Sequence, residues 1–188
     1  MTNFHDPSRR AFLGAGLAAV GCGIAAPALA APRRLLLPKG KPRALSFYNL
    51  HTDEKLHVTY WKDGRYDRTA WGRINHILRD HYSGDTHVMD LRLIDLVHDL
   101  QTRLGNDRPV DIISGYRSPA TNHLLRERGG GVAKHSYHMR GMAVDIRLDG
   151  TSLSHLHNTA LAMRRGGVGY YPSSDFVHVD VGPVRRWG

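Results

Sequence analysis

The chain has 188 residues and a net charge of +9, with 41% apolar and 23% charged residues. These proportions fit one globular domain and exclude wholesale disorder. The excess of basic residues favours an anionic partner such as nucleic acid, a membrane surface or an acidic polymer, and composition does not choose among them.

The first thirty residues have the features of an export signal. Arg9 and Arg10 precede a stretch, from Ala11 to Ala31, that is free of charge and rich in Ala and Gly. It contains small residues at Ala28 and Ala30, as a cleavage site requires. We predict that residues 1–30 are a twin-arginine signal peptide, in preference to a membrane anchor, and that the mature protein is periplasmic without stable membrane insertion.

Removal of this signal changes the chemistry available to the chain. It takes away Cys22, the only cysteine, so the mature protein has neither a disulfide nor a thiol nucleophile. Lipidation of Cys22 is a less favoured alternative. It also removes Arg9, Arg10 and Asp6, which leaves 24 basic and 16 acidic side chains and a charge of +8. Export argues against a nucleic-acid partner for this basic domain.

The mature chain alternates between strand and helix patterns. Residues 31–42 contain three prolines and four basic residues and are predicted to be a linker. Apolar periodicity and turn residues first predict a hairpin of strands 44–50 and 55–61 and helices near 71–78 and 94–104. A strand at 109–114 and a helix at 119–128 follow, and then a glycine loop at 129–131 that we expect to be mobile. The last predicted elements are a strand at 142–148, a helix ending at Gly166-Gly167, and strands at 168–171 and 176–181. This pattern predicts one α+β domain over residues 43–188, with helices packed on a mainly antiparallel sheet.

Two of the predicted strands carry polar groups on the face opposite the core. Alternation leaves Asp145 and Arg147 on that face of one strand, and His178 and Asp180 on that of the other. If the strands are neighbours, Asp145 and His178 meet, and the loop that carries His138 can fold back over them. Two imidazoles and a carboxylate suit Zn²⁺ with one open position. From spacing alone, ordinary surface or core histidines remain an alternative.

The motif Ser136-x-His138-x-x-Gly141-x-Ala143-x-Asp145, followed by His178, resembles the metal motif of the LAS metallopeptidases, a group that includes the hedgehog domain. Further segments resemble the murein endopeptidases of the MepK type: Ile113–Ser118, Gly131–Lys134, Gly166–Pro172 and Phe176–Asp180. The resemblance covers essentially the whole chain. It implies an LAS/hedgehog-like domain, one zinc ion held by His138, Asp145 and His178, and hydrolysis of peptide cross-links in peptidoglycan.

The resemblance also implies roles around the metal. Arg117 matches an arginine that binds the scissile carbonyl oxygen, with a surface ion pair as the alternative. Asp175 occupies the position where many relatives have a glutamate base, and Asp180 is expected to support a ligand imidazole or to serve as the base instead. The expected substrate contacts are Tyr116, Ser136 and Tyr171, with His135 a weaker candidate.

Two other functions stay open at this stage. A D,D- or L,D-carboxypeptidase would use the same zinc chemistry on the ends of murein stem peptides. A non-catalytic wall-binding module would keep the zinc for structure alone. We expect the protein to be a monomer. The sequence has no His-Glu-x-x-His, Cys-x-x-Cys, Gly-x-Ser-x-Gly or P-loop motif that would favour another catalytic class.

Overall fold

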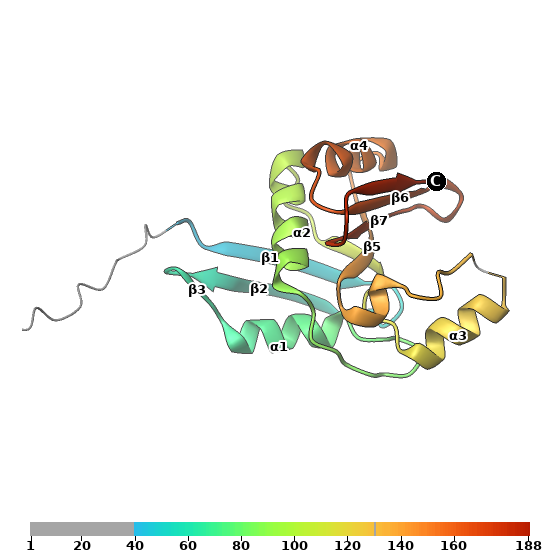
Figure 1. Cartoon of the computed structure of the whole chain (residues 1–188). Coiled ribbons are helices and arrows are strands. Elements are labelled where there is room, and N and C mark those ends of the chain that lie inside the picture. The colour runs from blue at the N-terminus through green and yellow to red at the C-terminus, as the bar shows by residue number, and fades with distance from the viewer. Residues whose placement is uncertain (1–39, 130) are drawn as a thin grey trace, which may run out of the picture. The chain divides into compact units, whose positions relative to one another are not determined.

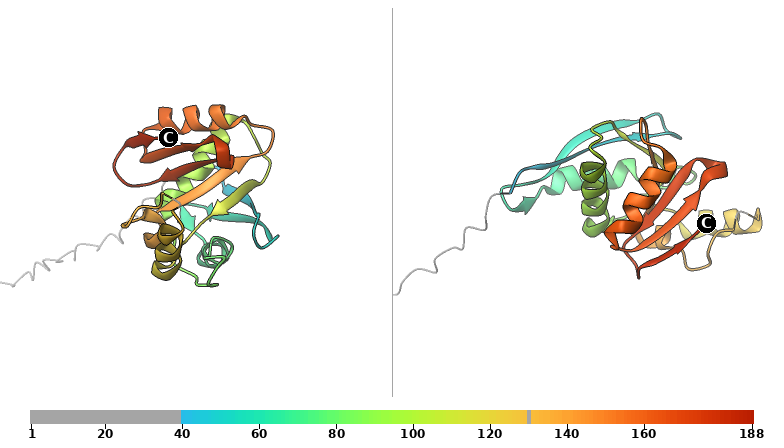
Figure 2. Two further views of the ribbon diagram at one scale, coloured as in Figure 1. Left: turned by 90° about the vertical axis from the view of Figure 1, so that its right-hand side faces the viewer. Right: turned by 90° about the horizontal axis from the view of Figure 1, so that it is seen from above.

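The computed structural model describes residues 40–129 and 131–188. The predicted signal peptide, most of the predicted linker and the centre of the glycine loop lie outside the described residues. Helices and one open sheet make up the described part (Figures 1 and 2). Among its helices, none combines the length and apolar character needed to cross a membrane.

Eight strands form the sheet, in the order β3-β2-β1-β4-β5-β7-β6-β8. Their bounds are β1 Arg43–Asn49, β2 Lys55–Lys62, β3 Arg65–Tyr66, β4 Val110–Ser114, β5 Ala143–Leu148, β6 Gly167–Tyr171, β7 Phe176–Asp180 and β8 Arg185–Trp187. The β1–β4 and β6–β8 pairs are parallel and the other pairs are antiparallel. The expected α+β class with a mainly antiparallel sheet is confirmed, while the short strands β3 and β8 were not predicted.

Each α-helix begins at a polar side chain that accepts a backbone N–H of its first turn, which satisfies a donor with no partner inside the helix. The helices are α1 Arg68–Ile77, α2 Leu91–Leu104, α3 Pro119–Glu127 and α4 Leu153–Met163, capped by Asp67, Asp90, Ser118 and Ser152. Gly105 ends α2 in the left-handed conformation, as predicted. The predicted end of α4 at Gly166-Gly167 is wrong, because Arg164 already takes the left-handed cap with a φ of 51°.

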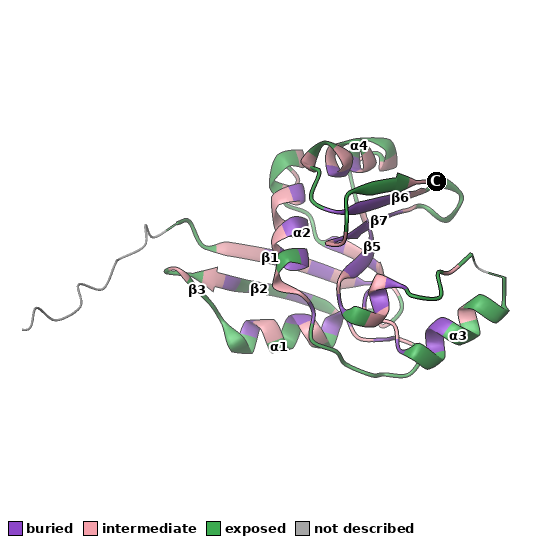
Figure 3. Ribbon diagram, in the orientation of Figure 1, coloured by how far each residue is buried: buried purple, intermediate pink, exposed green. Residues whose placement is uncertain are grey.

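One face of the sheet forms the core with α1, α2 and α4 (Figure 3). The strand residues buried there are aliphatic or aromatic and alternate with polar ones, as in Val144, Ile146 and Leu148 of β5 and Val177 and Val179 of β7. Full burial of one such aliphatic side chain contributes roughly 1.5–3 kcal/mol to stability. The alternation leaves the opposite face of β5 and β7 free for polar groups.

Candidate metal and active site

Strands β5 and β7 place two of the expected metal ligands side by side. They are direct neighbours in the sheet, and their antiparallel pairing makes Asp145 and His178 Cα partners. Both side chains point away from the core, because the valines next to them in sequence point into it. The local alternation therefore brings these two groups together.

The third expected ligand, His138, comes from a short 3₁₀ helix, η1 (Tyr137–Arg140). Ser136 caps this helix through its Oγ, and Gly141 ends it with a φ of 63°. A side chain at Gly141 would overlap the carbonyl of Val88, so glycine is required there. These two residues of the predicted motif thus act on the backbone that carries His138.

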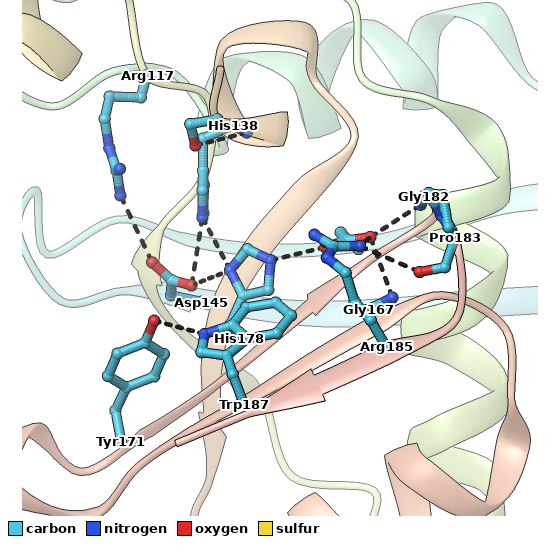
Figure 4. Close-up of polar contacts among 12 residues, drawn as sticks. Arg117, His138, Asp145, Gly167, Tyr171, His178, Gly182, Pro183, Arg185 and Trp187 are labelled. Carbon is cyan, nitrogen blue, oxygen red and sulfur yellow. Dashed lines mark hydrogen bonds and ion pairs between the residues drawn. The ribbon is translucent and has the colours of Figure 1, made fainter. Parts of the chain in front are cut away.

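The three side chains converge on one point (Figure 4). His138 Nε2 lies 3.1 Å from His178 Nδ1 and 3.3 Å from Asp145 Oδ1, and His178 Nδ1 lies 2.8 Å from Asp145 Oδ1. Each of the three residues is less than a tenth exposed. Three ligand atoms this close together, and shielded from water, have the arrangement of one face of a metal coordination shell.

The outer nitrogen of each ring is already committed to a partner. His138 Nδ1 lies 2.7 Å from the carbonyl of Gly115, and His178 Nε2 lies 3.0 Å from Asp180 Oδ2. Because these acceptors take the N–H of each ring, the inner nitrogens, His138 Nε2 and His178 Nδ1, are left to bind a cation. The donor set of two imidazoles and one carboxylate fits a zinc ion with one open position.

The pKa values of the cluster follow from burial and mutual contact. Burial alone would lower the pKa of His178, but its hydrogen bonds to Asp145 and Asp180 raise that pKa to about 8. Burial lowers the pKa of His138. Burial alone would raise the pKa of Asp145, but His138 and His178 hold it well below its usual range. The Asp145 carboxylate therefore stays ionised between the two rings, as a metal ligand requires.

Arg117 lies beside the cluster, as its motif predicted. Its Nη2 is 3.6 Å from Asp145 Oδ2 and 3.2 Å from Ser114 Oγ, and its side chain is 11% exposed. Its backbone N–H donates to the carbonyl of His138. The guanidinium thus sits at the edge of the cluster, where it lines the same cavity as the three ligands.

That cavity measures about 500 Å³ and opens above the ligands. Ser136, Tyr171 and the exposed His135 also line it, so two of the three expected substrate contacts and the weaker candidate are at the cavity. Among the described residues that line it, Asp145 is the only acid. The structure therefore supplies no second carboxylate at the cavity wall.

Asp175 and Tyr116 are not brought to this cavity. The Asp175 side chain is 63% exposed, and its carboxylate pairs with Arg147 at 2.9 Å. Arg147 also pairs with Asp111, and Asp175 is not among the residues that line the cavity. Tyr116 stacks on His87 with ring centroids 4.6 Å apart. Neither placement is the one that a general base or a substrate contact requires.

Asp180 is at the centre but cannot exchange protons with a substrate, because it is 0% exposed. Burial alone would raise its pKa, but hydrogen bonds from His178, Arg185 and two backbone N–H groups lower it well below its usual range. Its place behind His178 matches the supporting role expected for it.

Two residues of the site were missed by the sequence analysis, Arg185 and Trp187 of β8. Arg185 pairs with Asp180 at 2.6 Å, and the Trp187 ring lies 5.1 Å from that of His178, with Nε1 donating to the Tyr171 hydroxyl at 2.8 Å. Both line the cavity. Gly167 and Gly169 of β6 leave the space that these two side chains fill, and no sequence pattern indicated which residues fill it.

Comparison with known proteins gives concordant matches. The family model described as peptidoglycan L,D-endopeptidase MepK matches residues 38–187. The peptidoglycan L,D-endopeptidase MepK of Escherichia coli (strain K12) is 42% identical over 182 residues, which cover 97% of this chain and 98% of that protein. The probable peptidoglycan L,D-endopeptidase MepK of Haemophilus influenzae is 37% identical over 186 residues, or 98% of each chain.

Proposed function

Because this chain belongs to the family of the peptidoglycan L,D-endopeptidase MepK, we propose that it is a zinc-dependent endopeptidase that hydrolyses the L,D peptide cross-links of peptidoglycan. The observation that carries the proposal is the convergence of His138, Asp145 and His178 beneath an open cavity. An open cavity above the ligands leaves room for a substrate at the fourth position of the metal.

The residues around the ligands suit hydrolysis of an amide bond. A zinc ion held by His138, Asp145 and His178 would supply a Lewis acid and would lower the pKa of water at the site. Arg117, fixed by Ser114 and by Asp145, presents a guanidinium that stabilises negative charge as it develops on the carbonyl oxygen. Asp180 holds the ring of His178 in place from behind.

Proton transfer to the leaving amine needs a group that faces the cavity. Asp175, the base expected from the sequence, is paired with Arg147 outside it. We assign this role to His135, an exposed imidazole that lines the cavity three residues before His138. An imidazole ring can both accept and donate a proton, as this role requires.

The remaining assignments concern where and with what the enzyme works. We propose export by the twin-arginine route, cleavage after Ala30 and action in the periplasm, since Arg9-Arg10 precede an uncharged stretch and the relatives are named for action on peptidoglycan. We also propose one zinc ion per chain, because one cluster of three ligands is found among the described residues, and a monomer as the working form.

The test is the conversion of purified cross-linked muropeptides. Dimers joined through L,D bonds and dimers joined through D,D bonds are incubated separately with the zinc-loaded protein, with His138→Ala as the control, and products are identified by mass. We expect monomers from the L,D dimers with the native protein only. Release of terminal D-amino acids from intact dimers would instead establish a carboxypeptidase, and binding without any product would leave a wall-binding module.

A further inference from the structure

Two of the three β6 positions on the face that carries the metal centre, Gly167 and Gly169, have no side chain, and the third is Tyr171, which lines the cavity. Parallel pairing places Gly167 beside Arg185 of β8 and Gly169 beside Trp187, while Gly169 also pairs with His178 of β7. A Cβ at Gly167 would overlap the Arg185 guanidinium and the Asp180 carboxylate, and one at Gly169 would overlap the Trp187 ring. Side chains of β8 can therefore lie across β6 and reach β7.

The Arg185 side chain occupies this space and forms a bidentate ion pair with the Asp180 carboxylate. Nη1 donates to Asp180 Oδ1 at 3.0 Å and Nη2 to Oδ2 at 2.6 Å. The same guanidinium is placed between the rings of Tyr137 and Trp187, 5.0 and 4.9 Å from their centroids. Two parallel hydrogen bonds and two aromatic faces leave the guanidinium little freedom to move.

The Asp180 carboxylate that pairs with Arg185 also forms a hydrogen bond with the His178 ring. Asp180 Oδ2 accepts from His178 Nε2 at 3.0 Å, and Oδ1 accepts from the backbone N–H groups of Gly167 and Gly182. Two-armed pairing fixes the plane of a carboxylate as well as its position. The plane of Asp180 then sets the direction in which the His178 ring presents Nδ1 to the cluster.

We propose that Arg185 is a positioning residue of the metal centre: it fixes Asp180, Asp180 fixes the His178 ring, and the ring presents Nδ1 to the metal. The inference rests on the proposed function in one respect, that His178 is a metal ligand. It also gives the Gly167-x-Gly169 pattern a function, because without these glycines the last strand could not contact the centre.

The experiment measures the release of zinc from the loaded protein to a chromophoric chelator, independently of peptidase activity. We expect Arg185→Met to release zinc about tenfold faster, in the range observed when partners of metal ligands are removed. Arg185→Lys should fall between it and the native protein, since an ammonium cannot pair with both oxygens. Arg186→Met is the matched control: Arg186 is exposed on the same strand and should release zinc at the native rate.

Two further variants separate the possible failures. Gly167→Ala keeps Arg185 but adds a methyl group where its guanidinium meets Asp180, so this variant should also release zinc faster than the native protein. Circular dichroism checks that the variant is folded. His178→Ala tests the ligand itself. Native release from Arg185→Met and Gly167→Ala together with fast release from His178→Ala would overturn the inference alone, whereas native release from His178→Ala would overturn the metal site. Should Arg185→Met not fold, native release from Arg185→Lys and Gly167→Ala would also overturn the inference.

Discussion

At the scale of single residues, each histidine of the proposed metal site is held by the ring nitrogen that points away from the cluster. For His138 the partner is a backbone carbonyl, that of Gly115, and a side chain at Gly115 would overlap the backbone of Leu78. For His178 the partner is a buried carboxylate, Asp180. The protein therefore sets the orientation of each ring, which reduces the entropy lost when a metal binds.

Replacement of Arg117 tests the stabilisation of negative charge on the carbonyl oxygen. Loss of a group that stabilises charge on a carbonyl oxygen commonly lowers kcat about 10²- to 10³-fold, and we expect Arg117→Ala to lower kcat by that amount. Arg126→Ala, at an exposed arginine of α3, is the control and should keep native activity. Steady-state cleavage of a cross-linked dimer and zinc content would be measured together; a native kcat for Arg117→Ala would contradict the assignment.

The two candidates for proton transfer make opposite predictions. We expect Asp175→Asn to keep kcat within about twofold, because its carboxylate pairs with Arg147 outside the cavity. His135→Gln should lower kcat about 10²-fold or more, since a general acid–base group contributes that much. The measurement is the pH dependence of kcat for both variants. A large loss in Asp175→Asn with none in His135→Gln would reverse the assignment.

At the scale of elements, a buried carboxylate joins the loop after α1 to the start of α3. Asp80 accepts from the backbone N–H groups of Tyr82 and Ser118, each at 2.9 Å, and is 1% exposed. Ser118 follows Arg117 directly, so this contact also fixes the turn that presents the Arg117 guanidinium to the cavity. The loop is therefore part of the support of the active site.

The hydrogen bonds of Asp80 should make the free energy of unfolding depend on pH. Burial alone would raise the pKa of Asp80, but its hydrogen bonds lower it from 3.8 to about 2, so the ionised form stabilises the fold by about 2 kcal/mol. This contribution is complete above about pH 4 and is lost as the pH falls through about 2. Asp80→Asn should therefore lower the free energy of unfolding near neutral pH and lose its effect near pH 2.

Urea unfolding of the zinc-free protein at a series of pH values measures this difference. Asp85→Asn, at an exposed carboxylate of the same loop, is the matched control and should have little effect at any pH. A destabilisation by Asp80→Asn that is as large near pH 2 as near neutral pH would show that the loss comes from packing and not from the charge.

Sequence patterns predicted those elements whose signal is local. The alternation in β5 and β7 predicted which side chains face the core, and Ser118-Pro119 and Gly105 marked the start of α3 and the end of α2. Strand β8 was missed because three residues, two of them arginine, show no alternation of apolar side chains. It exists because it pairs with β6 and packs on glycines distant in the sequence, and such contacts leave no local pattern.

The meeting of Asp145 and His178 could be predicted for the same reason, whereas the ligand set that includes His138 was implied by the family resemblance and the positions of the other site residues could not be predicted. Asp145 and His178 face away from the core by alternation, so only the adjacency of their strands had to be assumed. The positions of Asp175 and Tyr116 depend on their partners, Arg147 and His87, and no spacing in the sequence indicates those contacts. The sheet order, which places β7 between β5 and β6, is likewise non-local.

At the scale of the whole molecule, the positive charge of the chain is complementary to the negative charge of peptidoglycan. Without residues 1–30 the chain has 24 basic and 16 acidic side chains, a net charge of +8. Peptidoglycan stem peptides carry free carboxylates, so long-range attraction should concentrate such an enzyme at the wall. This attraction acts between solvent-exposed charges and is therefore sensitive to screening by salt.

Binding to isolated, intact wall material should accordingly weaken as the salt concentration rises. Raising NaCl from about 0.1 M to about 1 M shortens the screening length from about 10 Å to about 3 Å, and we expect most of the bound protein to be released. Co-sedimentation of the inactive His138→Ala variant avoids digestion of the wall during the measurement. Binding that is independent of salt would indicate that contacts within the cavity, and not net charge, hold the enzyme on the wall.

The measurement that tests the proposed zinc endopeptidase most directly is a titration of the metal-free protein with zinc. Cleavage of an L,D-cross-linked muropeptide dimer is followed at each addition, beside His178→Ala. We predict that the rate rises in proportion to zinc, reaches its plateau at one ion per chain, and stays near zero in the variant. Full cleavage before any zinc is added, or no cleavage of the dimer at one bound ion per chain, would contradict the proposal.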